Sequence, residues 1–242
     1  WEWGRLNGLQ NTGSVLLAGV CVALCGAAWQ AGWLVQPLPM LWLVTGAAWV
    51  LGGAFLLRAG VAGWPRIPRT VRLVGGVLGL SLAWLAMAQA RVVGINFLLS
   101  VLLLVWVADI FAYFAGRTFG LKFTKSKLAP AISPGKSWEG VWGGMAGVVV
   151  LALVWVWADK TFAPAVPSFY SQLASRSMLL LLVSVVFMGG MSVVGDLVES
   201  LIKRSAGAKD SSRLLPGHGG VLDRIDALLP TLPLAMMLVS FT

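Results

Sequence analysis

The chain has 242 residues, of which 58% are hydrophobic and only 11% are charged, and its mean hydropathy is +0.86. Soluble globular chains carry about 25% charged residues, so this composition excludes an ordinary soluble protein. The 13 tryptophans suit a membrane–water interface, where one edge of the indole is wet and the rest is apolar. The sequence therefore predicts an all-α, polytopic integral membrane protein.

Seven apolar runs are long enough to cross a bilayer, which takes roughly 20 apolar residues. They are continuous and lack the residue-by-residue alternation of an outer-membrane barrel, so we expect helices. Arg72 lies at the edge of the third run, and Asp226 lies inside the start of the last. The expected spans form one transmembrane domain over residues 1–242 and cover 13–34, 38–57, 71–90, 94–115, 137–157, 178–195 and 225–242.

Basic residues are divided unevenly between the two sides of these runs. If the segment before residue 13 is cytoplasmic, the cytoplasmic side receives all but three of the 18 Lys and Arg residues. The exceptions are Arg91, Lys160 and Arg176. This division follows the positive-inside rule, and contact with anionic lipid heads explains the net charge of +9. No basic domain with exposed aromatics stands outside the membrane, so we expect no nucleic-acid partner.

The nine acidic residues are concentrated in a few places. All except Glu2 and Asp159 lie in three stretches, which contain Asp109, Glu139 and the run 195–226. Membrane orientation does not require cytoplasmic carboxylates. Carboxylates clustered among Lys and Arg indicate a site that binds polyphosphate through metal ions.

Carboxylates recur at helical spacing near the C-terminal end. Asp196, Glu199 and Lys203 would share one face of a helix that continues the sixth run beyond the membrane. Asp223 and Asp226 are three residues apart at the start of the last run, although Asp226 alone would also suit the positive end of a helix. Two such helix ends could hold one or two hard cations, because Mg²⁺ prefers a few carboxylate oxygens plus substrate phosphate oxygens.

Cations and glycines complete this stretch. Lys203, Arg204, Lys209 and Arg224 could neutralise phosphates that the metal leaves uncovered, although an isolated Lys203–Arg204 pair would be explained by topology alone. The loop PGHGG surrounds His218 with three glycines, which permit close backbone approach to a phosphate. His218 itself is expected to donate a hydrogen bond to phosphate or to organise the loop.

The 27 residues from Ser200 to Asp226 resemble the signature of the phosphatidate cytidylyltransferases, also called CDP-diglyceride synthases. The segments that carry the resemblance are SLIKR, the following KD and LPGHGGVLDRID. The segment ISPGKSWEG at 132–140 is similar to the family element Ser-Pro-x-Lys-[Ser/Thr]-x-Glu-Gly. The resemblance implies a membrane nucleotidyltransferase of phospholipid biosynthesis, which transfers CMP from CTP to phosphatidic acid and releases CDP-diacylglycerol and pyrophosphate.

With this resemblance, each candidate residue has an expected role. Phosphatidate is already ionised, so catalysis requires positioning and charge stabilisation, and no protein nucleophile. The cofactor is expected to be Mg²⁺, with room for a second, divalent or monovalent, cation; the metal ligands are Asp196, Asp223 and Asp226. The expected catalytic residues are Asp223, Lys209, Asp210 and His218. The expected substrate-binding residues are Ser133, Lys136, Lys203, Arg204, Arg224, Glu139, Asp109 and Arg117.

Two of these assignments have structural alternatives. Asp109, Tyr113 and Arg117 recur every four residues and would form one stripe on a helix. An intramembrane aspartate is usually functional, but an Asp109–Arg117 network through Tyr113 would explain the stripe equally well. Glu139 could support a ligand, pair with a lysine or occupy the first turn of a helix.

Two other functions compete with the transferase. A CTP-dependent lipid or polyprenol kinase would share the membrane bundle and the nucleotide but would transfer the γ-phosphoryl group. A transporter or channel would distribute polar residues near the middle of several spans. Here the charged groups collect at the cytoplasmic end, which favours an enzyme.

The resemblance also carries expectations about the whole protein. Family members usually have a hydrophobic hairpin before a stretch like Trp-Glu-Trp, and this chain begins with those residues and no methionine. We therefore expect nine spans in the full-length protein. We also expect a homodimer in the bacterial inner membrane, in contact with membrane lipids and with its active site facing the cytoplasm.

Overall fold

Six long helices form the body of the protein, in a computed structural model that describes residues 1–241. By length and composition each of the six could cross a membrane: α2 (Asn11–Gln30), α3 (Pro39–Ala59), α4 (Arg69–Val93), α5 (Ile95–Phe119), α6 (Trp138–Phe162) and α8 (Met178–Ser205). The shorter elements are α1 (Glu2–Leu6), η1 (Trp64–Arg66), β1 (Lys127–Ala129), β2 (Ser133–Ser137), α7 (Phe169–Arg176), α9 (Leu222–Ile225) and α10 (Leu228–Ser240). The all-α membrane bundle is confirmed.

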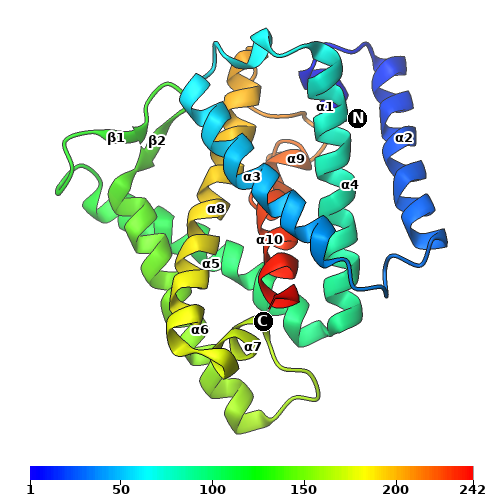
Figure 1. The fold of residues 1–242 in the computed structure, drawn as a ribbon. Helices are drawn as coiled ribbons and strands as arrows, with labels where there is room; N and C mark the ends of the chain where they lie inside the picture. The colour runs from blue at the N-terminus through cyan, green and yellow to red at the C-terminus, as the bar shows by residue number, and fades with distance from the viewer. Residues whose placement is uncertain (242) are drawn as a thin grey trace.

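The last expected span differs from the prediction. Residues 225–242 do not begin a single long helix, because α9 ends at Ile225 and α10 has only 13 residues. At 1.5 Å per residue, α10 covers about 20 Å, which is short of the roughly 30 Å hydrocarbon core. It is buried through Pro230–Met236 and packs against α3, α4 and α8 in the middle of the bundle (Figure 1). Hydropathy alone could not separate this internal helix from a span.

A chain of hydrogen bonds inside the bundle connects α3, α4 and the loop after α2. Trp42 is completely buried and donates its indole N–H to Oε1 of Gln89, at 2.9 Å. The amide of Gln89 donates in turn to the carbonyl oxygens of Trp33 and Gln36, in the loop after α2. These bonds fix the end of the bundle that carries α7 and the α2–α3 loop. The C-terminal end of α8 lies at the opposite end (Figure 1).

Small residues allow α5 and α6 to pack closely. Gly140, Gly143, Gly144 and Gly147 follow one face of α6 and meet the backbone and side chains of residues 108–115. Glycine at such positions lets two backbones approach within the membrane, where there is no hydrophobic driving force between helices. The α5–α6 pair forms one wall of the candidate site described below.

Substitution of Gly147 tests this packing. A Cβ atom at Gly147 would lie 2.5 Å from the Phe111 ring, so Gly147→Leu is expected to destabilise the protein by about 1–3 kcal/mol through overpacking. Thermal unfolding in detergent should show the lower stability. Gly19→Leu on α2 is the control, because a Cβ there meets nothing within 4 Å. Equal unfolding temperatures for the two variants would contradict the proposed packing.

Candidate active site

Lys203 links two carboxylates at the C-terminal end of α8. Its Nζ lies 2.5 Å from Oε2 of Glu199, one turn earlier, and 2.5 Å from Oδ1 of Asp223 in α9. The side chains of Lys203 and Asp223 are only 12% and 8% exposed. Because charges withdrawn from water must be paired, this ion pair fixes α9 against the end of α8.

The second oxygen of Asp223 organises the signature loop. It accepts hydrogen bonds from the backbone N–H of Ser211 (2.9 Å), the hydroxyl of Ser211 (2.9 Å) and the N–H of Gly220 (2.7 Å). Burial by itself raises the pKa of a carboxyl group, but Lys203 and these donors together hold the pKa of Asp223 well below its ordinary value. Asp223 is therefore an ionised carboxylate at neutral pH.

A second ion pair lies in a cavity between α5, α6 and α8. Nζ of Lys136, on β2, is 2.5 Å from Oδ2 of Asp196, and Oδ1 of Asp196 accepts from the Ser200 hydroxyl at 3.2 Å. The cavity has a volume of about 470 Å³. Its polar lining includes Asp109, Tyr113, Arg117, Lys136, Ser137 and Asp196.

The stripe on α5 faces this cavity. Nη1 of Arg117 donates to the hydroxyl oxygen of Tyr113 at 3.0 Å, as the structural alternative expects. Asp109 lines the same cavity but interacts electrostatically with Asp196 and Lys136. The complete Asp109–Tyr113–Arg117 network is thus not formed, and Asp109 is directed toward the site.

Asp226 is brought to α8 by a glycine. A Cβ atom on Gly195 would lie 2.5 Å from the carbonyl oxygen of Asp226, so the α9–α10 junction could not approach a larger residue. Oδ1 of Asp226 accepts from the N–H of Ala227 at 2.7 Å. The carboxylate also lies close enough to Asp196 and Asp109 to repel them electrostatically. Such repulsion favours a cation at this place.

His218 and Arg224 hold the loop between α8 and α9. The guanidinium of Arg224 donates through Nε (3.1 Å) and Nη2 (2.6 Å) to the carbonyl oxygen of His218, and Nδ1 of His218 lies 3.0 Å from the carbonyl oxygen of Pro216. Gly217 and Gly219 have φ of +74° and +79°, a region that favours glycine. Of the two expectations for His218, loop organiser agrees with these contacts.

The other expected residues are distributed around this centre. Lys209 and Asp210 are exposed in the loop. Arg204 donates to the carbonyl oxygen of Ile132, at 3.4 Å, and so connects α8 to the β hairpin. Ser133 lies at the start of β2, whereas the hairpin residues among the cavity lining are Gly135, Lys136 and Ser137.

Glu139 is a buried first-turn residue of α6. It is 3% exposed, and Oε1 accepts from the N–H groups of Phe123 and Thr124 and from the Thr124 hydroxyl. Its carboxylate thus anchors the chain that follows α5, and it is absent from the cavity lining that the structure describes for residues 1–241. The first-turn alternative describes its position best.

Glu2 is a residue that the sequence analysis missed. Its carboxylate accepts hydrogen bonds from Ser211, Ser212, Val221 and Leu222, on both sides of the signature loop. These partners are more than 200 residues away along the chain, so no local spacing indicates the contact. The available signal was the rarity of acidic residues, since Glu2 stands between two tryptophans in a chain with only nine.

The expected metal ligands are not gathered into one cluster. Within residues 1–241, no three His, Cys, Asp or Glu side chains form a group that could hold a metal ion. Asp196 and Asp226 lie near each other, whereas both oxygens of Asp223 already accept hydrogen bonds. The all-oxygen donors fit a hard cation such as Mg²⁺, which needs few protein ligands when a substrate supplies phosphate oxygens.

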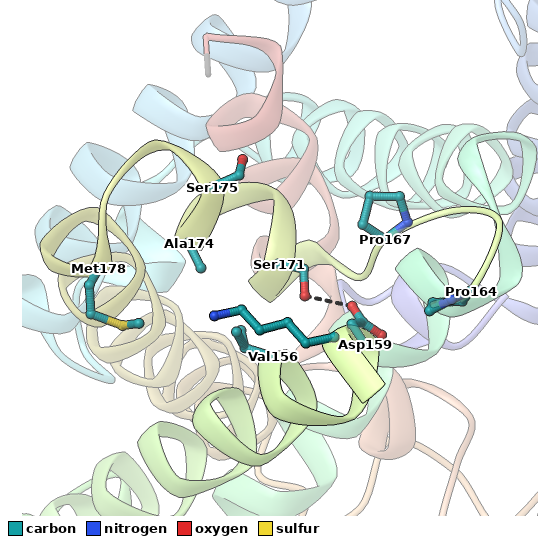
Figure 2. A pocket seen from close by; sticks show the side chains of 9 residues that line it. Val156, Asp159, Pro164, Pro167, Ser171, Ala174, Ser175 and Met178 are labelled. Carbon is teal, nitrogen blue, oxygen red and sulfur yellow. Dashed lines mark hydrogen bonds between the residues drawn. The ribbon is translucent and has the colours of Figure 1, made fainter. Parts of the chain in front are cut away.

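A separate cavity lies at the opposite end of the bundle. It has a volume of about 350 Å³ and is lined by residues of α6, α7, the loop between them and the first residue of α8, Met178 (Figure 2). There Asp159 accepts from the Ser171 hydroxyl at 2.6 Å (Figure 2). It also accepts from the N–H of Ser168 (2.8 Å) and the amide of Asn96 (3.0 Å). None of the expected site residues lines it, whereas Asp109, Arg117, Lys136 and Asp196 line the cavity between α5, α6 and α8, which is therefore the candidate active site.

Comparisons with known proteins identify the family of the chain. The model of the cytidylyltransferase family matches residues 1–242. The chain is 39% identical to a phosphatidate cytidylyltransferase of Pseudomonas aeruginosa over 238 residues, which are 96% of this chain and 80% of that protein. It is 36% identical to the Brucella abortus enzyme of the same name over 95% of this chain and 75% of that protein. It is 47% identical to the Haemophilus influenzae one over 58% of this chain and 44% of that protein. The chain therefore belongs to the cytidylyltransferase family.

Proposed function

We propose that this chain transfers CMP from CTP to phosphatidic acid, producing CDP-diacylglycerol and pyrophosphate. The observation that carries the proposal is the pairing of lysines with carboxylates at the end of α8, beside a cavity between apolar helices. Lys136–Asp196 lines that cavity, and Lys203–Asp223 supports the adjacent signature loop. Such a site can receive a lipid from the bilayer and a nucleotide from water. Relatives named phosphatidate cytidylyltransferase support the choice of substrates.

The reaction requires little covalent help from the protein. An oxygen of the phosphatidate phosphate attacks the α-phosphorus of CTP, and the bond from that phosphorus to the bridging β-oxygen breaks. The electron pair leaves with pyrophosphate. The obstacle is the mutual repulsion of two polyanions, which cationic side chains reduce by positioning and electrostatics. Lys136 and Arg117 line the cavity, so we assign them to phosphate groups in it.

The proposal includes Mg²⁺, held by Asp196 and Asp226 and, after exchange of one hydrogen bond, by Asp223. When bound, it would neutralise charge on the reacting phosphates and the leaving pyrophosphate. A second cation, divalent or monovalent, belongs to the same proposal. Lys203 meanwhile keeps Asp223 ionised and oriented, and Gly220 and Ser211 fix the other side of that carboxylate.

The surroundings of the enzyme are proposed on the same basis. The chain is an integral membrane protein, and we assign it to the bacterial inner membrane with the α8–α9 end facing the cytoplasm, where CTP is available. The excess of Lys and Arg in the connections at that end supports this orientation. A homodimer and contact with membrane lipids complete the proposal.

The test is conversion of labelled CTP by the purified protein in micelles that contain phosphatidic acid, with and without Mg²⁺. We expect CDP-diacylglycerol and pyrophosphate, in equal amounts, only when Mg²⁺ is present. Release of CDP with a newly phosphorylated lipid would identify the competing kinase. Movement of a solute across vesicles without CTP turnover would favour a transporter. Absence of CDP-lipid under all conditions would refute the proposal.

Replacing Asp196 tests the cavity. Asp196→Asn removes the charge that pairs with Lys136 and one proposed metal ligand, and is expected to lower kcat by about 100-fold or more. Turnover of labelled CTP measures the effect, and thermal unfolding checks that the variant is folded. Asp159→Asn is the control, since Asp159 is a hydrogen-bonded carboxylate at the other end of the bundle. Equal kcat values for the two variants would remove Asp196 from the active site.

A further inference from the structure

We propose that Glu2 is a positioning residue for the reaction, which holds the two sides of the signature loop together and thereby presents Asp223. The inference rests on the proposed function. Glu2 is only 6% exposed and lies in α1, far along the chain from the signature at 200–226 and from the element at 132–140. A buried carboxylate is costly unless it is hydrogen-bonded. Here, each of its two oxygens has two donors.

The four donors come from both sides of the loop. Oε1 accepts from the Ser212 hydroxyl (2.5 Å) and the N–H of Val221 (3.0 Å). Oε2 accepts from the N–H of Leu222 (2.7 Å) and, at 3.3 Å, shares the single proton of the Ser211 hydroxyl with Asp223. One carboxylate thus joins residues 211–212, which follow α8, to residues 221–222, which begin α9. Each oxygen takes one backbone N–H, and a backbone donor cannot rotate away.

These contacts connect Glu2 directly to Asp223. The Ser211 hydroxyl lies within hydrogen-bonding distance of both carboxylates, 3.3 Å from Glu2 and 2.9 Å from Asp223. The N–H of Gly220 donates to Asp223, and the next N–H, of Val221, donates to Glu2. The two acids therefore bind neighbouring groups of the same backbone. A shift of Glu2 would move the donors that orient Asp223.

The helix that carries Glu2 is itself held firmly. The indole N–H of Trp3 donates to the carbonyl oxygen of Arg72 on α4 at 3.1 Å, and its ring meets Trp64 edge-on at 5.8 Å. Gly76 leaves room for the Trp3 ring, which a Cβ atom would strike. Nε of Arg69 donates to the carbonyl oxygen of Asn7 at 3.0 Å. The anchor for the loop is therefore the bundle itself.

The first test is Glu2→Gln. Glutamine keeps one acceptor oxygen, so its NH₂ group must face the N–H of Val221 or of Leu222, donor against donor. We expect kcat per folded molecule to fall about 100-fold through misplacement of the site, with little change in the KM for CTP. Glu2→Asp keeps two acceptor oxygens and should recover at least about tenfold of the lost kcat. Asp159→Asn should keep the wild-type kcat even if its unfolding temperature falls equally.

A double-mutant cycle separates positioning from general destabilisation. Ser211→Ala removes the shared hydroxyl and should lower kcat about tenfold, while the combination with Glu2→Gln should be no worse than Glu2→Gln alone. If the two substitutions damaged the structure independently, their fold-losses of kcat would multiply in the double variant. Losses that multiply, or that follow the unfolded fraction, would overturn the inference.

The design also keeps the inference apart from the proposed function. An inactive wild-type protein would refute the proposed function, and an active wild type with Glu2→Gln within threefold of its kcat would refute only the role of Glu2. If Glu2→Gln does not fold, Gly220→Ala replaces it, because the added Cβ would lie 2.0 Å from the Ser211 hydroxyl and 2.4 Å from Oε1 of Glu2, and so would displace the carboxylate without removing its charge. The same loss of kcat is expected, and an unchanged kcat would overturn the inference.

Discussion

Asp223→Asn is expected to lower the turnover of CTP about 1,000-fold while the protein stays folded in the membrane. In the native site, Oδ1 of Asp223 pairs with the ammonium group of Lys203, and Oδ2 accepts hydrogen bonds from the N–H groups of Ser211 and Gly220. All of these polar neighbours are therefore donors. An asparagine must turn its own NH₂ group toward one of these donors. The substitution also removes the negative charge that balances Lys203, and this carboxylate is one of the proposed metal ligands.

The measurement is the rate of CDP-diacylglycerol formation at saturating CTP and phosphatidate. Detergent size-exclusion chromatography should show the same elution for variant and wild type. Asp223→Glu retains the charge on a longer side chain, and is expected to remain slow because the loop donors are placed for aspartate. A near-wild-type rate for Asp223→Asn would exclude this carboxylate from catalysis.

Lys203→Met is expected to have the largest effect on stability, about 3–5 kcal/mol. The substitution leaves Glu199, which is 5% exposed, and Asp223 with no countercharge between them. Among the described residues, Oε1 of Glu199 has no hydrogen-bond partner, so this carboxylate depends on Lys203. An uncompensated buried charge costs more than the pair contributes when complete.

Unfolding in detergent, followed by circular dichroism or a thiol probe, measures this effect. Lys160→Met, an exposed lysine near the C-terminal end of α6, serves as the control and should unfold like the wild type. Adding Glu199→Gln to Lys203→Met removes one of the stranded charges and should restore part of the stability. A double variant no more stable than Lys203→Met would contradict the assigned ion pairs.

Local spacing correctly predicted which of the candidate residues lie together on one helix. Asp196, Glu199 and Lys203 do share α8, and the Asp223–Asp226 pair begins the last segment. Spacing along the chain could not predict which charged side chains would form ion pairs with each other. Lys203 pairs with Glu199 on its own helix and with Asp223 on α9, whereas Asp196 pairs with Lys136 from the β hairpin. Their pairing depends on how β2 and α9 approach α8.

The last apolar run shows the same limit for the fold. Residues 225–242 are hydrophobic enough to enter a membrane, and mean hydropathy does not distinguish lipid from protein as surroundings. In the structure α10 fills the centre of the bundle, and the short α9 beside it carries Asp223 to Lys203. The prolines lie within α10, and the chain before α10 approaches α8 closely at Gly195. Both features accompany the position of α10 inside the bundle.

The sequence by itself determined the membrane class, six long apolar helices that the structure confirms, and the family to which the signature belongs. These follow from composition and from spacing within short segments, which act locally along the chain. Only the tertiary structure decided three sets of hydrogen bonds. Glu2 accepts from residues within 211–222, Arg224 donates to the carbonyl oxygen of His218, and Glu139 accepts from the chain that follows α5. The physical reason is that a buried polar group must find a donor or acceptor wherever packing brings one, and packing joins segments that are distant in sequence.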